Sequence, residues 1–253
     1  MNCVLIIPAR YKSSRFPGKP LTLIKGKTMI RHVYDQCLKA VPKDSIYVAT
    51  EDRRIADHCK KNNIQFIMTS DECLTGTDRL CEVAKLVEAD YYINIQGDEP
   101  LFNPIDIQNL ILELSKQKNL YDVYCGYCSI DSGDTFFSLN MPKVIFNKRK
   151  ELVYISRAPI PSNKSKTFKK GWRQVCAYSL PRKALIAFSA IKKKTPLEQI
   201  EDCELIRFLE LGFEIRMIKM TSVSIPVDIK EDLAKVKKIL KKNKLYKRNQ
   251  EIF

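Results

Sequence analysis

A loop rich in positive charge follows the first apolar run of the chain. The run covers residues 3–7, and the loop after it carries four cations: Arg10, Lys12, Arg15 and Lys19. A second loop, NIQGDEP at residues 94–100, carries Asp98 after another apolar run. Polyphosphates are bound by cations and backbone N–H groups, and by a divalent metal that carboxylates hold. The two loops therefore predict polyphosphate binding, and the alternative for the first is a solvated basic loop.

The common glycine-rich phosphate motifs are absent from the sequence. The tetrapeptide PGKP contains Gly-Lys, but no glycine lies five residues before Gly18 and the residue after Lys19 is Pro20, so the Walker pattern is not met. No G-x-G-x-x-G opens a helix after the first apolar run. Any nucleotide would therefore be bound by a loop rich in side chains.

Strand and helix patterns alternate in the first half of the chain. Apolar runs predict strands over 3–7, 45–50, 65–68 and 91–95, and helical spacing predicts helices over 29–40, 52–62 and 79–89. This alternation is typical of a parallel sheet covered by helices on both faces. Ligands of such doubly wound sheets bind outside the carboxyl ends of the strands. The loops that follow residues 7 and 95 are therefore the expected binding site.

The second half of the chain is less regular. It predicts strands over 122–129, 143–146, 152–156, 175–179 and 214–220, helices over 196–211 and 231–241, and a mobile loop over 162–171. No stretch has the length or composition of an interdomain linker. We therefore expect an α/β fold with a Rossmann-like, doubly wound mixed sheet, in a single domain that spans residues 1–253.

The composition is basic and rich in cysteine. Lys and Arg number 44 against 29 Asp and Glu, which gives a formal charge of +15 and a surface that attracts anions without selecting among them. The apolar run at residues 3–7 is too short for a secretory signal, and no stretch is long enough to span a bilayer. Nine cysteines without an export signal are typical of reduced thiols. These features predict a cytoplasmic protein with no membrane partner.

Six motifs, in order along the chain, resemble one family. They are IIPARYKSSRFPGKPL (6–21), TGTDRL (75–80), NIQGDEP (94–100), SRAPIP (156–161), PLEQIE (196–201) and IPVDIKEDL (225–233). Together they resemble the bacterial CMP-Kdo synthetases, the 3-deoxy-manno-octulosonate cytidylyltransferases. The resemblance implies a fold of the nucleotide-diphospho-sugar transferase type and a homodimer. It also implies that a hydroxyl of a Kdo-like sugar acid attacks the α-phosphate of Mg-bound CTP, for lipopolysaccharide or capsule biosynthesis.

The resemblance implies roles for individual residues as well. Arg10, Arg15 and Lys19 would hold the triphosphate and offset the charge that develops at the α-phosphate. Asp98 and Asp228 would hold Mg²⁺. The remaining residues would contact the nucleotide (Ala9, Arg10, Ser13, Gly76 and Arg79) or the acceptor (Gln96, Arg157, Gln174, Tyr178, Glu198 and Glu201).

Several of these residues also have an ordinary structural interpretation. Asp98 fits a turn residue, and Asp228 fits the N-cap of a helix that begins just after it. Arg79 fits an exposed residue in the first turn of a helix. Arg157 would hold the acceptor carboxylate through two hydrogen bonds in the functional interpretation, and it fits an exposed strand arginine otherwise.

Two positions depart from the family pattern, and both lie on the predicted acceptor side. QVCAY at 174–178 places Gln174 where the family has histidine, while Tyr178 is retained, and ELIR at 204–207 places Leu205 where glutamine is usual. The nucleotide and metal motifs are intact. A Kdo-like sugar acid is therefore the first acceptor to test. The alternative is a smaller acid, such as a phosphorylated amino acid used in capsule modification.

Two other classes of function compete with cytidylyl transfer. CGYC at 125–128 has the C-x-x-C spacing of a redox or zinc site, but it lies in a predicted strand, whereas thioredoxin-type pairs open a helix. The basic tail at 237–248 suggests nucleic-acid binding, yet it offers only Tyr246 for base stacking. Its neighbours Val236, Ile239 and Leu240 fit a helix packed on the body. We therefore expect inert buried thiols and no nucleic-acid partner.

Overall fold

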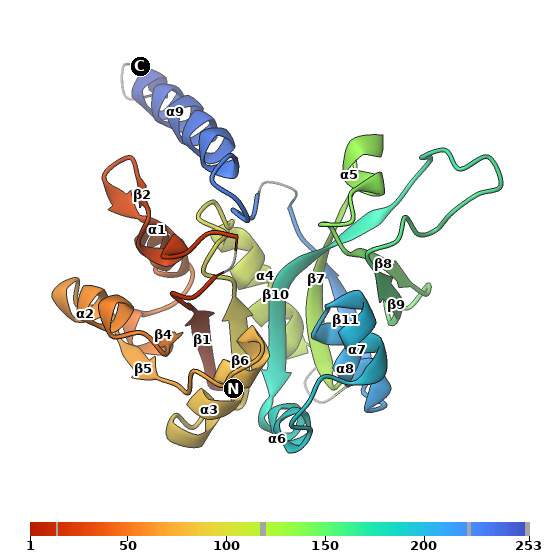
Figure 1. The fold of residues 1–253 in the computed structure, drawn as a ribbon, viewed down its shortest axis with the longest axis horizontal. Coiled ribbons are helices and arrows are strands. Elements are labelled where there is room, and N and C mark those ends of the chain that lie inside the picture. The colour runs from red at the N-terminus through yellow and green to blue at the C-terminus, as the bar shows by residue number, and fades with distance from the viewer. Residues whose placement is uncertain (14, 117–119, 222–223, 251–253) are drawn as a thin grey trace.

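A nine-stranded mixed sheet forms the centre of the computed structural model (Figure 1). The structure describes the chain except for residues 14, 117–119, 222–223 and 251–253 and the side chains of residues 242–250. The strands of the sheet are β1 (Cys3–Pro8), β4 (Ile46–Thr50), β5 (Phe66–Met68), β6 (Tyr91–Ile95), β7 (Val123–Ser129), β8 (Lys143–Phe146), β9 (Leu152–Ser156), β10 (Trp172–Pro181) and β11 (Ile215–Lys219). A separate hairpin contains β2 (Leu23–Ile24) and β3 (Lys27–Thr28).

The sheet is parallel in its first half and mixed in its second. Its order is β11-β7-β10-β6-β1-β4-β5, and β8 pairs with β10 and β9. β1 runs parallel to β4 and β6, whereas β10 runs antiparallel to β6 and β7. The predicted doubly wound mixed sheet is confirmed, and β10 joins the two halves of the chain because it pairs with a strand from each.

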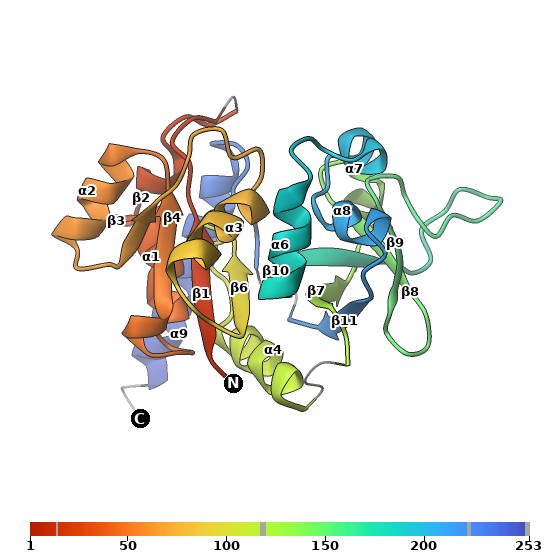
Figure 2. The same cartoon turned by 90° about the horizontal axis from the view of Figure 1, so that it is seen from below.

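Helices cover both faces of the sheet (Figures 1 and 2). They are α1 (Met29–Cys37), α2 (Arg53–Lys61), α3 (Gly76–Leu86), α4 (Pro104–Lys116), α5 (Gly133–Phe137), α6 (Arg182–Ala190), α7 (Pro196–Glu201), α8 (Leu205–Glu210) and α9 (Asp232–Gln250). Val4 and Ile6 of β1 pack in one core with α3, α6 and α8, whereas Leu5 and Ile7 pack in another with α1, α2 and α4. Successive side chains of a strand point to opposite faces. An apolar run is therefore what a strand buried on both faces requires.

One predicted helix is two helices in the structure. The pattern over 196–211 predicted a continuous helix, but α7 ends at Glu201 and α8 begins at Leu205. Asp202 between them has φ 47°, in the left-handed region, which stops an α-helix. The break places Glu198 in α7 and Arg207 in α8, and these two residues form the ion pair described below.

The C-terminal helix packs on the body through its first half. Val236 of α9 is fully buried with Phe16, Ile24 and Val227, and Ile239 and Leu240 are partly buried beside it, together with Leu233. This packing agrees with the predicted helix on the body, and Figure 1 shows the rest of α9 projecting from it. The segment between β9 and β10 extends away from the sheet as a loop, as predicted for 162–171 (Figures 1 and 2). Within the described part of the chain, no helix is both long and apolar enough to cross a membrane.

Candidate active site

The loops after β1 and β6 meet because a glycine lets their backbones approach. The two strands are parallel neighbours, so their carboxyl ends lie at the same edge of the sheet. A Cβ atom at Gly97 would lie 2.7 Å from the carbonyl oxygen of Pro8, which is closer than a side chain allows. Gly97 therefore brings Asp98 beside the basic loop.

A cavity of about 190 Å³ lies where these loops meet. Its walls come from the basic loop, the start of α3, the loop after β6 and the segment before α9. The predicted nucleotide and metal residues that line it are Ala9, Arg10, Ser13, Arg15, Lys19, Gly76, Arg79, Asp98 and Asp228, together with Gln96, which was predicted to contact the acceptor. The fold thus brings together the residues that the motifs assigned to the triphosphate and the metal.

Each predicted metal ligand is paired with a cation of the basic loop. Lys19 Nζ lies 2.6 Å from Asp98 Oδ2 and donates a second hydrogen bond to the Val227 carbonyl at 2.9 Å. Arg15 Nη2 lies 3.4 Å from Asp228 Oδ1. The Val227 N–H donates to the Asp98 carbonyl at 2.9 Å. This backbone hydrogen bond joins the two segments that carry the carboxylates.

The carboxylates of Asp98 and Asp228 suit a magnesium ion that arrives with phosphates. Helix α9 begins at Asp232, so Asp228 does not adjoin its first turn as an N-cap would. Mg²⁺ prefers oxygen ligands and is often held by one or two carboxylates together with substrate phosphates. Among the described residues, no group of three or more His, Cys, Asp or Glu side chains could hold a metal alone. A pair of carboxylates in a cation-lined cavity therefore fits a metal–nucleotide complex better than a protein metal cage.

Arg79 is buried in the cavity wall and is not an exposed first-turn residue. Its side chain is 5% exposed, and its guanidinium lies 2.7 Å from Glu51. It also donates to the Thr69 hydroxyl at 2.6 Å and to the Ser70 carbonyl at 3.1 Å. Glu51 follows β4 and Thr69 follows β5. Arg79 thereby joins α3 to the carboxyl edge of the sheet and holds one wall of the cavity in place.

The first turn of α3 lies between two cavities. Thr75 caps it: the Thr75 hydroxyl accepts from the Asp78 N–H at 3.2 Å, and the Asp78 carboxylate accepts from the Thr75 N–H at 2.8 Å. The Thr77 N–H donates to Glu204 at 3.0 Å. Free N–H groups at a helix N-terminus favour bound anions. Thr75 and Gly76 line both cavities, so this turn can contact both substrates of a transfer reaction.

A second cavity of about 300 Å³ adjoins the first. The residues that line both are Arg10, Arg15, Leu74, Thr75, Gly76, Gln96, Asp98 and Asp228. The predicted acceptor residues that line the second cavity are Gln96, Arg157, Gln174 and Tyr178. The two cavities therefore form one continuous site, with the predicted metal ligands in the shared wall.

The side chains that contact the unusual Gln174 side chain form a neutral wall of the second cavity. Gln174 Nε2 donates to the Tyr178 hydroxyl at 2.8 Å, and the Cys203 thiol donates a weak hydrogen bond to Gln174 Oε1 at 3.8 Å. Burial raises the pKa of Tyr178 well above its usual value, so the phenol keeps its proton. Burial likewise raises the pKa of Cys203 to about 12. An amide, a phenol and thiols thus replace the imidazole expected from the family pattern.

Arg157 and Glu201 hold each other through the backbone. The Arg157 guanidinium donates to the Glu201 carbonyl at 2.7 Å, to the Asp202 carbonyl at 2.9 Å and to the Leu139 carbonyl at 3.1 Å. The Glu201 carboxylate accepts from the Ser156 hydroxyl at 2.6 Å and from the Arg157 N–H at 2.8 Å. Arg157 lines the second cavity, whereas Glu201 lines neither cavity. Glu201 therefore shapes the loop that carries Arg157.

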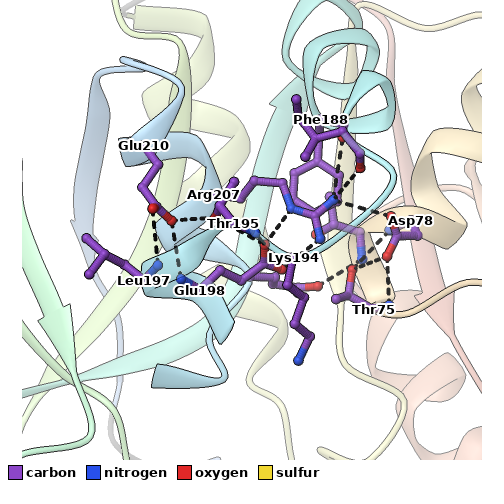
Figure 3. Close-up of polar contacts among 12 residues, drawn as sticks. Thr75, Asp78, Phe188, Lys194, Thr195, Leu197, Glu198, Arg207 and Glu210 are labelled. Atoms are coloured by element: carbon purple, nitrogen blue, oxygen red, sulfur yellow. Dashed lines mark hydrogen bonds and ion pairs between the residues drawn. The ribbon is translucent and has the colours of Figure 1, made fainter. Parts of the chain in front are cut away.

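Glu198 lies away from both cavities in a buried ion pair (Figure 3). Arg207 donates to its two carboxylate oxygens, from Nε at 2.6 Å and from Nη2 at 2.8 Å. The same carboxylate accepts the Thr195 N–H at 3.1 Å as part of the capping box of α7. Arg207 Nη1 lies 3.6 Å from Asp78 Oδ1. Glu198, predicted to contact the acceptor, lines neither cavity and instead joins α7 to α8 through this ion pair.

Five charged residues of the second cavity were not identified from the sequence: Glu99, Arg173, Lys194, Asp202 and Glu204. Glu99 follows Asp98 directly and is buried, with 4% of its surface exposed. Burial raises the pKa of Glu99 to about 7, although the hydrogen bond from the Ser224 hydroxyl lowers it. Glu204 is partly buried, and desolvation raises its pKa as well. Glu99 lies within NIQGDEP and Glu204 within ELIR, so both motifs contained the signal.

The two cysteines of CGYC do not form a pair. Cys125 packs in the core with α3, α6 and α8, whereas Cys128 packs in the core on the other face of the sheet. Burial raises the pKa of both thiols, which is the opposite of a reactive thiolate. Both thiols are free. The strand therefore separates them, and the interpretation as inert buried thiols agrees with their positions.

The chain matches one family over nearly its whole length. A family model described as cytidylyltransferase matches residues 4–252. The 3-deoxy-manno-octulosonate cytidylyltransferase of Protochlamydia amoebophila (strain UWE25) is 37% identical over 248 residues, covering 95% of each chain. The 8-amino-3,8-dideoxy-manno-octulosonate cytidylyltransferase of Shewanella sp. (strain W3-18-1) is 36% identical, covering 93% of this chain and 97% of that one.

A solved structure agrees with the sequence matches. It is described as CMP:2-keto-3-deoxy-manno-octonic acid synthetase complexed with CTP, and it is 34% identical with a TM-score of 0.89. The match covers 96% of this chain and 100% of that one. The sheet, the helices on its two faces and the loops of the site therefore follow a known arrangement, and the chain belongs to the cytidylyltransferase family that its six motifs predicted.

Proposed function

We propose that the protein transfers CMP from CTP to a hydroxyl of 3-deoxy-manno-octulosonate (Kdo) and releases pyrophosphate. The observation that carries this proposal is the shared wall of the two cavities, which includes Arg10, Arg15, Asp98 and Asp228. A transfer between two substrates requires their reacting atoms to be held together. CTP in the first cavity and an acceptor in the second would meet at this wall.

The residues of the first cavity would act on the phosphate chain. The acceptor hydroxyl gives up its proton as its oxygen bonds to the α-phosphorus, and the bond from that phosphorus to pyrophosphate breaks. Arg10, Arg15 and Lys19 would offset the charge that develops, because preorganised cations stabilise such a transition state. Asp98 and Asp228 would hold Mg²⁺, which when bound supplies further positive charge to the phosphates.

The acceptor is proposed from the relatives and from the cavity. The relatives are named for Kdo and for its 8-amino analogue, and Arg157, Arg173 and Lys194 offer positive charge in the second cavity to a carboxylate. The neutral wall at Gln174 distinguishes this chain from the family pattern. A smaller acid, such as a phosphorylated amino acid, is the competing acceptor because an altered polar wall changes which hydroxyl groups are recognised.

Pyrophosphate release tests the proposal directly. The protein is incubated with CTP and Mg²⁺ and with one acceptor at a time: Kdo, its 8-amino analogue and phosphorylated amino acids. Turnover of Kdo supports the proposal, and turnover of a small acid alone would replace it with the competing acceptor. In that second case Gln174→His should recover little Kdo activity, whereas robust Kdo turnover by the unmodified protein would show that Gln174 is tolerated.

The proposed metal ligands give a second test. Asp98→Asn and Asp228→Asn should each lower turnover by about 100-fold or more, because one charge is lost from the cation site. Circular dichroism would confirm that both variants fold. The exposed Asp71→Asn variant is the control and should keep wild-type turnover. Near-normal activity of Asp228→Asn would leave that residue without a metal-binding role.

The proposal also includes a homodimer, a cytoplasmic location and a role in lipopolysaccharide or capsule biosynthesis. The resemblance to the family supports a homodimer, which size-exclusion chromatography with light scattering would test through the molar mass. Nine free thiols and the use of CTP support a cytoplasmic enzyme. The acceptor would then enter lipopolysaccharide or capsule biosynthesis, and loss of the activated sugar from cells that lack the protein would test this.

A further inference from the structure

A fully buried lysine lies behind the wall of the second cavity. Lys143 opens β8, is 0% exposed and does not itself line the cavity. Its ammonium donates to the Ser138 carbonyl at 2.9 Å and to the Arg157 carbonyl. Among the described residues, no carboxylate forms an ion pair with it. A buried ammonium without an opposite charge costs stability, so its presence is explained best by the backbone arrangement that it holds.

The two carbonyls that Lys143 binds belong to two segments that line the second cavity. Ser138 follows α5 and begins the segment 138–142, of which Asn140, Met141 and Pro142 line the cavity. Arg157 follows β9 and also lines the cavity. A single ammonium therefore closes the 138–142 segment against the backbone that carries Arg157.

Other hydrogen bonds make this closure a connected unit. The Arg157 guanidinium donates back to the Leu139 carbonyl at 3.1 Å, within the segment that Lys143 closes. The Gln174 N–H donates to the Pro142 carbonyl at 3.0 Å, which links the segment to the neutral wall. Charge-assisted hydrogen bonds are stronger than neutral ones. Lys143 supplies two of them at the centre of the unit, and it does not line the first cavity.

We propose that Lys143 is a positioning residue for the acceptor: it holds the 138–142 segment and Arg157 in the arrangement that binds the acceptor, and it leaves CTP binding unaffected. This inference rests on the proposed function, because the second cavity must be the acceptor site. Lys143 acts through the backbone of its neighbours and touches neither substrate.

Lys143→Met tests the inference, because methionine matches the lysine side chain as far as Cε and removes the ammonium donors. Two partly buried carbonyls then lose their ammonium donor, so the KM for Kdo should rise about tenfold or more. The dissociation constant of CTP, measured by calorimetry without acceptor, should stay within about twofold of wild type. Lys148→Met, in the exposed turn of the same hairpin, is the control and should change neither value.

The pH dependence of the unmodified enzyme gives an independent readout. Burial, and then the nearby Arg157 charge, lower the pKa of Lys143 to about 8, while Glu201 acts in the opposite direction. Arg173 of β10 also faces it, as the strand partner of Lys143. The ammonium loses its proton as pH rises through this value, so the wild-type KM for Kdo should rise by about two- to fivefold between pH 7 and 9.5. The KM of Lys143→Met should lack this rise.

The outcomes separate this inference from the proposed function. Absence of turnover by the wild-type protein with every acceptor would defeat both. Wild-type turnover with an unchanged Kdo KM in Lys143→Met, or with equal changes for Kdo and CTP, would overturn the positioning role alone. If Lys143→Met does not fold, the wild-type measurement decides: a Kdo KM that stays flat from pH 7 to 9.5 would overturn the inference, and a rise that spares the KM for CTP would support it.

Discussion

Replacing Arg207 by methionine should lower the free energy of unfolding by about 3 kcal/mol. Arg207 and Glu198 form two hydrogen bonds at 2.6 and 2.8 Å, and their side chains are 0% and 1% exposed. Removing one partner of a buried ion pair costs about 3–5 kcal/mol, because the other charge stays buried without compensation. Glu198 keeps the N–H of Thr195 at 3.1 Å, so we expect the lower end of that range.

A double variant separates the charge from the packing. Arg207→Met combined with Glu198→Leu should recover most of the loss, since no buried charge is left. Asp78, which lies 3.6 Å from Arg207 and is 20% exposed, can be solvated by water and should add little. Glu198→Gln should lower the free energy of unfolding but leave the KM for Kdo close to wild type, because Glu198 lines neither cavity.

Urea unfolding followed by circular dichroism measures these differences. Lys183→Met is the control, because Lys183 forms an exposed ion pair with Asp122 at 2.5 Å and such pairs contribute less than about 1 kcal/mol. The reasoning would be refuted by a loss below about 1 kcal/mol in Arg207→Met, or by a double variant no more stable than the single one.

Two further predictions concern the nucleotide cavity. Arg15→Ala and Lys19→Ala should each lower kcat/KM by about 100-fold or more, whereas Lys237→Ala on the exposed face of α9 should leave it unchanged; equal losses would mean that the basic loop contributes only net charge. Gly97→Ala should lower stability by about 1–3 kcal/mol and raise the KM for CTP, because its Cβ would lie 2.7 Å from the Pro8 carbonyl. Thermal unfolding together with CTP titration checks this, and wild-type values would show that the close approach is not required.

Much of the fold was predictable because local patterns carry it. The run from Cys3 to Ile7 is apolar throughout, and β1 is indeed buried on both faces, as a central parallel strand must be. In the first half, helices lie between the successive strands of the sheet, and parallel strands are joined by such crossover connections. The helix over 196–211 was predicted wrongly, because its apolar pattern continues through Asp202, whose left-handed backbone ends α7.

Some residues of the candidate site could be placed from the sequence, whereas others could not. The basic loop and Asp98 follow neighbouring strands, so topology alone places them together. Arg79 could not be judged from its own segment, because its partner Glu51 lies after a different strand. Glu198 and Glu204 occupy the same stretch of sequence, yet only Glu204 lines the second cavity. No local signal distinguishes the two glutamates, because their environments depend on the break between α7 and α8 and on the partner Arg207.

The sequence by itself determined the doubly wound sheet, because apolar and helical periodicity are local, and it indicated the family through six motifs in order along the chain. Only the tertiary structure decided which charges meet. In the structure Asp98 pairs with Lys19 and Asp228 with Arg15. Lys143 is buried behind the wall of the second cavity, and Glu198 pairs with Arg207. Such pairings depend on distances between segments far apart in the chain, and these distances exist only once the core has packed.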